Sequence, residues 1–110
     1  MLASPVLKRV PPSAQADVQS AVAILLRDPE VRRIRLFGSL AKGREPDFRS
    51  DLDLAVEGLA SARYLSVWAA LDQALRLPPD LVRWEEANDT LRAEIERWGA
   101  AVRNSGAKPD

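Results

Sequence analysis

Two aspartates one residue apart, in the segment "SDLDL", are the side chains best suited to chemistry in this sequence. Asp51 and Asp53 alternate with apolar residues at Leu52, Leu54 and Val56. This period of two predicts a strand whose carboxylates share one face, with Cα atoms roughly 6.5 to 7 Å apart. Carboxylates so placed repel each other unless a cation lies between them, and hard divalent ions prefer oxygen ligands. The ordinary alternative is the solvent face of an amphipathic strand.

Two further features strengthen the metal hypothesis. Gly38 and Ser39 follow an apolar strand and open the short segment "SLAKG", which Gly43 can end. The first N–H groups of a helix lack partners and attract anions, so this pair predicts a phosphate site, although Gly-Ser pairs are also common in turns. Asp80 opens a later strand that could lie beside the first two aspartates. Its alternative role is that of a turn residue after Pro79.

Composition narrows the chemistry. The chain has 110 residues, no histidine and no cysteine, and its 16 basic and 16 acidic side chains cancel. Serine-histidine triads, thiolate metal sites and disulfides are therefore excluded, and nucleic acid is not the expected partner. No apolar run is long enough to span a bilayer or serve as a signal peptide, so we expect a cytoplasmic protein without a membrane partner.

The elements that must position these residues follow from periodicity. We expect helices that begin at the caps Ser13, Ser61 and Asn88, the last ending at Gly99, with Leu26, Tyr64 and Trp68 among their core residues. Strands are expected over 31–38, 51–58 and 80–84, with a short last strand in "AAVR". The predicted fold class is α/β (α+β), a small mixed sheet with helices packed on it. We expect a lead-in over 1–12, one domain over 13–103 and a tail over 104–110.

The segments "FGSLAKG", "SDLDL" and "DLVRW" together resemble the minimal nucleotidyltransferases of the DNA polymerase beta superfamily. The resemblance covers about residues 31–102. It extends to the antitoxins of HEPN/MNT toxin–antitoxin pairs, which belong to this group. It implies that Gly38 and Ser39 bind the phosphates of a nucleoside triphosphate, expected to be ATP. It also implies that Asp51, Asp53 and Asp80 bind two Mg²⁺ ions, or Mn²⁺, with Asp80 helping to deprotonate the acceptor hydroxyl.

The sequence departs from the family pattern in two respects. The segment "AAV" is less hydrophobic than the usual last strand. Eleven residues separate Ser39 from Asp51, where ten is commoner in the family. Within this longer loop, Arg44 is the first choice for a residue that neutralises the triphosphate, followed by Lys42 and Arg49. Trp84 is expected to pack in the core or at a subunit interface, with base stacking as the alternative, whereas Trp68 and Trp98 are assigned to the core.

The resemblance implies transfer of AMP from ATP to a hydroxyl, expected to be a tyrosine on a co-encoded HEPN toxin that the chain neutralises. One alternative is a nucleotidyltransferase-like module that neutralises its partner by contact alone. Another is the catalytic subunit of a two-chain enzyme acting on a small molecule. Self-association is compatible with all three hypotheses.

Overall fold

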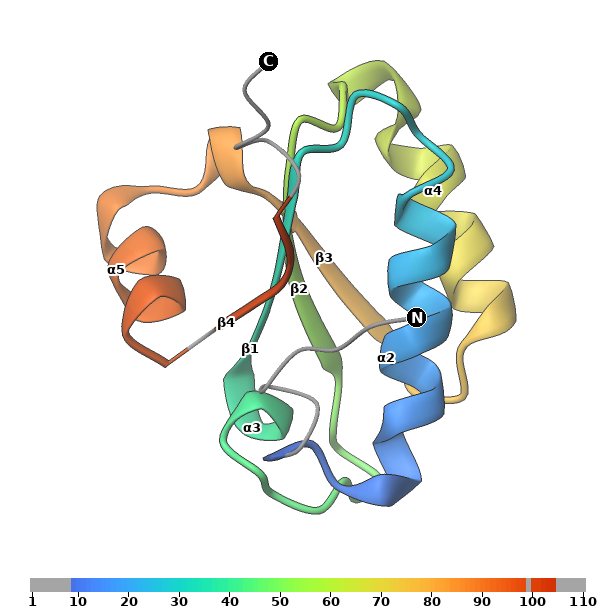
Figure 1. Ribbon diagram of the computed structural model, residues 1–110, viewed down its shortest axis with the longest axis vertical. Coiled ribbons are helices and arrows are strands. Elements are labelled where there is room, and N and C mark those ends of the chain that lie inside the picture. The colour runs from blue at the N-terminus through green and yellow to red at the C-terminus, as the bar shows by residue number, and fades with distance from the viewer. Residues whose placement is uncertain (1–8, 99, 105–110) are drawn as a thin grey trace.

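Helices and strands alternate along the described part of the chain, which covers residues 9–98 and 100–104 of the computed structural model (Figure 1). Gly99, the predicted helix stop, and the side chain of Trp98 lie outside the described residues, as do 1–8 and 105–110. In chain order the elements are α2 (Pro12–Leu25), β1 (Arg33–Phe37), α3 (Gly38–Ala41), β2 (Leu52–Glu57), α4 (Ser61–Ala74), β3 (Pro79–Arg83), the 3-10 turn η1 (Trp84–Glu86), α5 (Asp89–Trp98) and β4 (Ala100–Asn104).

The four strands form one mixed sheet in the order β3-β2-β1-β4. β1 runs antiparallel to both of its neighbours, whereas β2 and β3 run parallel. Parallel strands need a crossover connection, and α4 supplies it. The predicted small mixed sheet with helices packed on it is therefore confirmed.

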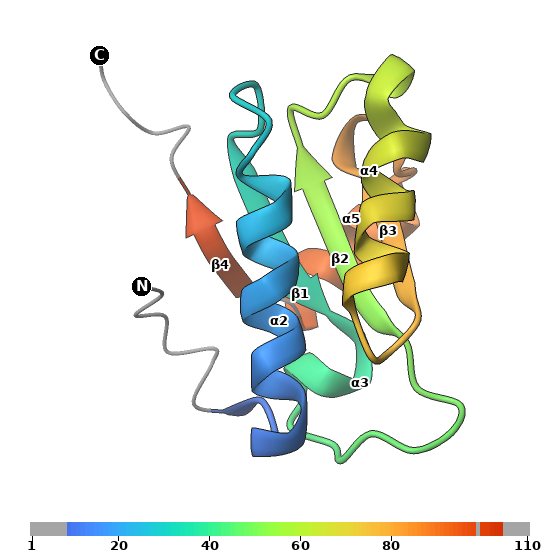
Figure 2. The same cartoon turned by 90° about the vertical axis from the view of Figure 1, so that its right-hand side faces the viewer.

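The sheet separates two hydrophobic clusters of different size. Helices α2 and α4 cover one face and α5 lies on the other (Figures 1 and 2). Leu52, Leu54 and Val56 of β2 point into the larger cluster under α2 and α4. Ala55, which lies between them, belongs to a smaller cluster with Ile95 of α5. Because Asp53 alternates with the same leucines, its side chain lies on the α5 face.

Asp17 of α2 connects the helical layer to the start of β3. Its carboxylate is buried, with 6% of the residue exposed. It accepts hydrogen bonds from the backbone N–H groups of Arg76 (3.0 Å) and Leu77 (2.8 Å). These two residues lead into β3, so Asp17 fixes the backbone that brings Asp80 to the sheet. Among the described residues it is the buried acid that sequence reasoning missed.

The helix starts were predicted correctly at one of three caps. The Asn88 side chain accepts a hydrogen bond from the Leu91 N–H (2.8 Å) at the start of α5. Ser13 and Ser61 are not caps, because α2 and α4 follow Pro11 and Ala60 and neither has a side-chain cap bond. Proline at the first position already fixes the helical φ of α2. The Ser13 hydroxyl instead donates to the Glu45 carboxylate (3.2 Å).

The prediction that Trp68 is a core residue was wrong. Its side chain is 37% exposed, whereas Leu71 is fully buried. The buried side of α4 runs through Tyr64, Val67 and Leu71. The helix is therefore rotated about its axis relative to the predicted buried side, which included Trp68 in place of Val67. Leu26 is only partly buried at the edge of the larger cluster.

In the described part of the chain, no helix combines the length and apolarity needed to cross a membrane.

Candidate functional site

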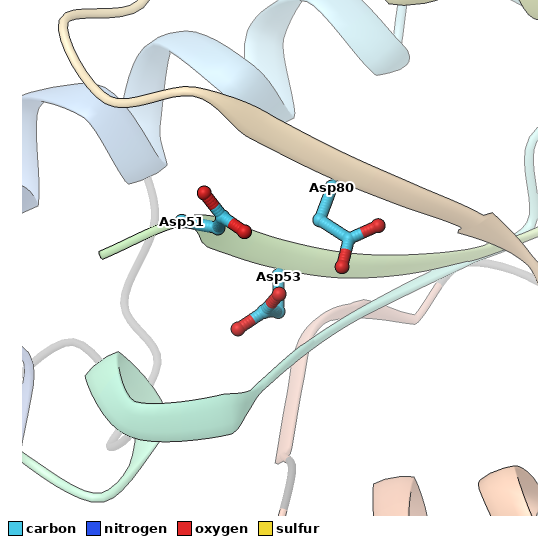
Figure 3. A group of neighbouring side chains, drawn as sticks. All are labelled: Asp51, Asp53 and Asp80. Carbon is cyan, nitrogen blue, oxygen red and sulfur yellow. The ribbon is translucent and has the colours of Figure 1, made fainter. Parts of the chain in front are cut away.

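Three carboxylates converge where β2 and β3 begin and β1 ends. Asp51 directly precedes β2, and Asp53 pairs with Asp80 of β3 across the parallel ladder. One carboxylate oxygen from each residue lies within 4.8 Å of the others, and Figure 3 shows the three side chains grouped at this edge. An oxygen-only donor set of this kind fits a hard divalent cation such as Mg²⁺ or Mn²⁺.

The surroundings of Asp53 raise the pKa of its carboxyl group. Its burial raises the pKa of its carboxyl to about 7, and a hydrogen bond with Asp80 and the charges of Asp80 and Asp51 add to the rise. Asp51 and Asp80 are exposed, so water reaches two of the three acids. A cation bound among them would favour the ionised form of Asp53 and reverse this shift.

Gly38 makes room for this acid. It has a φ of +78° and follows Phe37, whose Cα pairs with that of Asp53. A Cβ at position 38 would overlap the Asp53 carboxylate, with the Asp53 Cγ at 2.9 Å. Any larger residue would therefore displace the acid as well as strain the backbone. The sequence predicted Gly38 as a phosphate-binding residue, and the packing against Asp53 is an additional reason for glycine.

Ser39 lies in the four-residue helix α3, directly after Gly38. Its carbonyl accepts hydrogen bonds from the backbone N–H groups of Lys42 and Arg44, both at 3.1 Å. These bonds end the helix and turn the chain back toward the acids. Gly43 adopts a φ of +86° in this turn and donates its N–H to Leu40, as expected for the residue that ends the segment.

A polar cavity of about 380 Å³ connects the serine with two of the acids. It contains three of the residues that the sequence singled out for phosphate or triphosphate contacts, Ser39, Arg44 and Arg49, together with Asp51 and Asp53. Gly38, Lys42 and Asp80 are not among its lining residues. The full lining is Ser39, Arg44, Glu45, Asp47, Arg49, Ser50, Asp51 and Asp53.

The loop that holds the extra residue is ordered by its own polar side chains. The Asp47 N–H donates to the Ser50 hydroxyl (2.8 Å), and the Arg49 N–H donates to the Asp47 carboxylate (2.8 Å). The Ser50 N–H also donates to the Asp47 carbonyl (3.0 Å). Sequence reasoning did not select Asp47, Ser50 or Glu45 as lining residues. The turn-forming Asp and Ser pair was the available signal for two of them.

A second cavity, of about 430 Å³, lies between α2 and α4 and differs in character. Its lining is mainly apolar, and the Arg63 guanidinium pairs there with Asp28 at 2.6 Å. The pairing leaves no cluster of acids available for a cation. The acidic cavity is therefore the candidate site, although it is the smaller of the two.

Trp84 packs as the sequence predicted, but it lies just beyond the observed strand, whereas the predicted strand over 80–84 included it. β3 ends at Arg83, and Trp84 begins η1. Its ring packs against the smaller hydrophobic cluster. The guanidinium groups of Arg35 and Arg92 lie 4.3 Å and 4.9 Å from the ring centroid. The ring is thus engaged by protein side chains.

Comparison with known proteins agrees with this geometry. The family model described as polymerase beta, nucleotidyltransferase, matches residues 19–105. The search of curated proteins found no significant match.

Several solved structures share the fold. A chain from the complex of a tri-AMPylated Shewanella oneidensis HEPN toxin with an MNT antitoxin is 24% identical (TM-score 0.65, covering 82% of this chain and 71% of that chain). A chain from a toxin–antitoxin structure with AMP-PNP is 27% identical (TM-score 0.67, covering 78% and 73%). A minimal nucleotidyltransferase is 26% identical (TM-score 0.65, covering 80% and 91%).

Proposed function

Because the chain belongs to the polymerase beta nucleotidyltransferase family, we propose that it transfers AMP from ATP to a tyrosine hydroxyl of a HEPN toxin and so acts as an antitoxin. The observation that carries this proposal is the convergence of Asp51, Asp53 and Asp80 beside the cavity that contains Ser39. The three acids fit divalent metal ions, and the cavity fits the phosphates.

The metal ions are held by the three carboxylates in this proposal. When bound, Mg²⁺ neutralises charge on the phosphate oxygens and stabilises both the attacking and the leaving oxygen of the displacement. Asp53 is the acid whose ionisation depends most on the cation, because burial and its two acidic neighbours raise its pKa. Asp51 and Asp80 are exposed and remain accessible to substrates from solvent.

The triphosphate is bound by groups on α3 and the loop after it. The Ser39 hydroxyl donates to a phosphate oxygen, and the Arg44 guanidinium, which lines the same cavity, pairs with the charged phosphates. Gly38 keeps the backbone before Ser39 free of a side chain. Arg49 offers a second cation on the same lining.

The acceptor hydroxyl approaches from solvent, because two of the three acids, Asp51 and Asp80, are exposed. The hydroxyl oxygen forms a bond to the α-phosphorus, and the bond from that phosphorus to the oxygen bridging to the β-phosphate breaks. Pyrophosphate leaves with that electron pair. Asp80 accepts the hydroxyl proton, a role open to an exposed carboxylate in a chain without histidine.

The partner in this proposal is chosen from the family resemblance and from the toxin–antitoxin complexes in which similar chains occur. A chain 27% identical to this one occurs in a toxin–antitoxin structure with AMP-PNP, an ATP analogue. The same site chemistry would serve this chain if it binds a toxin that presents a hydroxyl to the exposed acids.

The test is a transfer assay with a purified HEPN partner encoded next to this chain. The partner, Mg²⁺ and ATP labelled at the α-phosphate should give a labelled partner band with wild-type protein. Asp51→Ala combined with Asp53→Ala should remove the label, because the metal ligands are lost. Asp72→Ala is the matched control, since it removes an exposed acid of α4 that is not one of the three clustered carboxylates and should leave labelling intact.

A different outcome would support the contact-only alternative. If wild type leaves the partner unlabelled while the double variant still binds and neutralises it, neutralisation does not require transfer. Mass spectrometry of the labelled partner would identify the modified side chain. A label on any residue other than tyrosine would correct the acceptor while leaving the reaction class in place.

A further inference from the structure

Phe48 is the most exposed large apolar side chain in the described part of the chain. It is 92% exposed, compared with 74% for Leu65 and 37% for Trp68. Its two neighbours in the chain, Asp47 and Arg49, both line the polar cavity. Phe48 itself is not among the lining residues, so its exposed ring lies next to the cavity lining in the chain and is not part of that lining.

The loop orders the backbone that carries this ring. Hydrogen bonds from the Asp47 N–H to Ser50 and from the Arg49 N–H to Asp47 fix the backbone on both sides of Phe48. The Arg49 guanidinium lies 5.3 Å from the centroid of the Phe48 ring. The cation therefore sits against the ring, while the exposed fraction of 92% leaves the ring open to a second planar group.

Within the part of the chain that the structure describes, the cavity has no aromatic side chain in its lining on which a nucleobase could stack. Its lining consists of serine, arginine, aspartate and glutamate side chains, which suit phosphates and metal ions. Two other aromatic rings are already engaged. Phe37 is 8% exposed in the smaller cluster. The guanidinium groups of Arg35 and Arg92 lie 4.3 Å and 4.9 Å from the centroid of the Trp84 ring. Among the described residues, Phe48 is the exposed aromatic side chain that directly adjoins two lining residues in the chain.

We infer that Phe48, supported by Arg49, is a stacking platform for the base of the bound nucleoside triphosphate. This inference rests on the proposed function, because it assigns the base position of the same nucleotide. Stacking on a phenyl ring is tolerant of base identity, and purines present the larger ring surface. The platform therefore favours purine nucleotides through contact area, without hydrogen-bond readout of the base edge.

The decisive comparison is between ATP and inorganic tripolyphosphate, which carries the same kind of phosphate chain and no base. Binding of each, with Mg²⁺, is measured calorimetrically for wild type, Phe48→Ala and Phe48→Trp. Phe48→Ala should weaken ATP binding by about 5- to 30-fold, the loss of one stacked base, and leave tripolyphosphate binding within twofold. Phe48→Trp should restore ATP affinity. Leu65→Ala is the matched control, since it removes an exposed apolar side chain from α4.

The outcomes separate this inference from the proposed function. Equal effects of Phe48→Ala on ATP and tripolyphosphate, or no effect on either, overturn the platform. Loss of binding to the partner toxin with unchanged ATP affinity likewise overturns it and makes Phe48 a docking residue. If wild type binds neither ligand, the nucleotide site of the proposed function fails and this inference fails with it. A smaller preference for ATP over CTP in Phe48→Ala supports the platform.

Discussion

Replacing Asp53 by asparagine should stabilise the metal-free protein while removing its response to metal. Asparagine keeps the size of the side chain and can still hydrogen-bond to Asp80, but it carries no charge. The oxygens of the three acids lie within 4.8 Å of one another. At that separation two unit charges repel by roughly 0.9 kcal/mol in water and roughly 3.5 kcal/mol at an effective dielectric constant of 20.

Because Asp51 and Asp80 are exposed, the value near that of water is the appropriate one. Removing two such repulsions should raise the free energy of unfolding by about 2 kcal/mol. For a domain of this size, that corresponds to a rise in Tm of about 8 °C or more.

The effect should depend on pH in a defined direction. The folded pKa of Asp53, about 7, lies above the ordinary value of 3.8. Between these values the folded state holds the proton more tightly, so the stability that Asp53 contributes falls as the pH rises and is lost above the folded pKa. The advantage of Asp53→Asn should thus be largest near pH 8.5 and shrink steadily as the pH is lowered toward 5.

Thermal unfolding at several pH values, in a chelator and then in Mg²⁺, measures both effects. Mg²⁺ should raise the Tm of wild type and leave that of Asp53→Asn nearly unchanged. Asp72→Asn serves as the control for loss of one exposed negative charge. A lower Tm for Asp53→Asn in chelator at pH 8.5 would refute the reasoning, because the carboxylate would then be stabilising the fold without metal.

Two further substitutions test the supports of the site. Ser39→Ala should weaken ATP binding by about 0.5 to 1.5 kcal/mol, through loss of one hydrogen bond, with Tm unchanged, and a large fall in Tm would make Ser39 structural. Asp17→Ala should lower the free energy of unfolding by about 2 to 4 kcal/mol in a denaturant titration, because the N–H groups of Arg76 and Leu77 lose a buried charged acceptor. Equal stability of Asp17→Ala and wild type would show that water replaces the carboxylate at that connection.

Much of the acidic cluster could be anticipated from the sequence because its first part is local. Asp51 and Asp53 must share a face whenever their segment is a strand, and the alternating leucines indicate one. The contact with Asp80 depends on a parallel pairing across α4, which periodicity alone does not specify. The order of the strands along the chain and the resemblance to the family supplied that expectation.

Other features depended on tertiary packing and could not be read from local patterns. Trp68 and Val67 both lie near the predicted stripe of α4, and only the docking of the helix on α2 and the sheet decides which one is buried. Ser13 and Ser61 have the residue type of a cap, but each lies one residue or more inside its helix. The overlap of a Cβ at position 38 with Asp53 required the register of β1 against β2.

The parallel pairing of β2 with β3 makes the acidic site dependent on the docking of a second segment of the chain onto the sheet. Asp53 pairs with β1 and Asp51 directly precedes the same strand, whereas Asp80 lies on β3, which joins the sheet through the α4 crossover. A ligand that requires all three acids binds only molecules in which that crossing is finished. Nucleotide and metal therefore stabilise molecules in which β3 is docked. Because these ligands bind near the start of β3, they should also slow the exchange of its amide hydrogens.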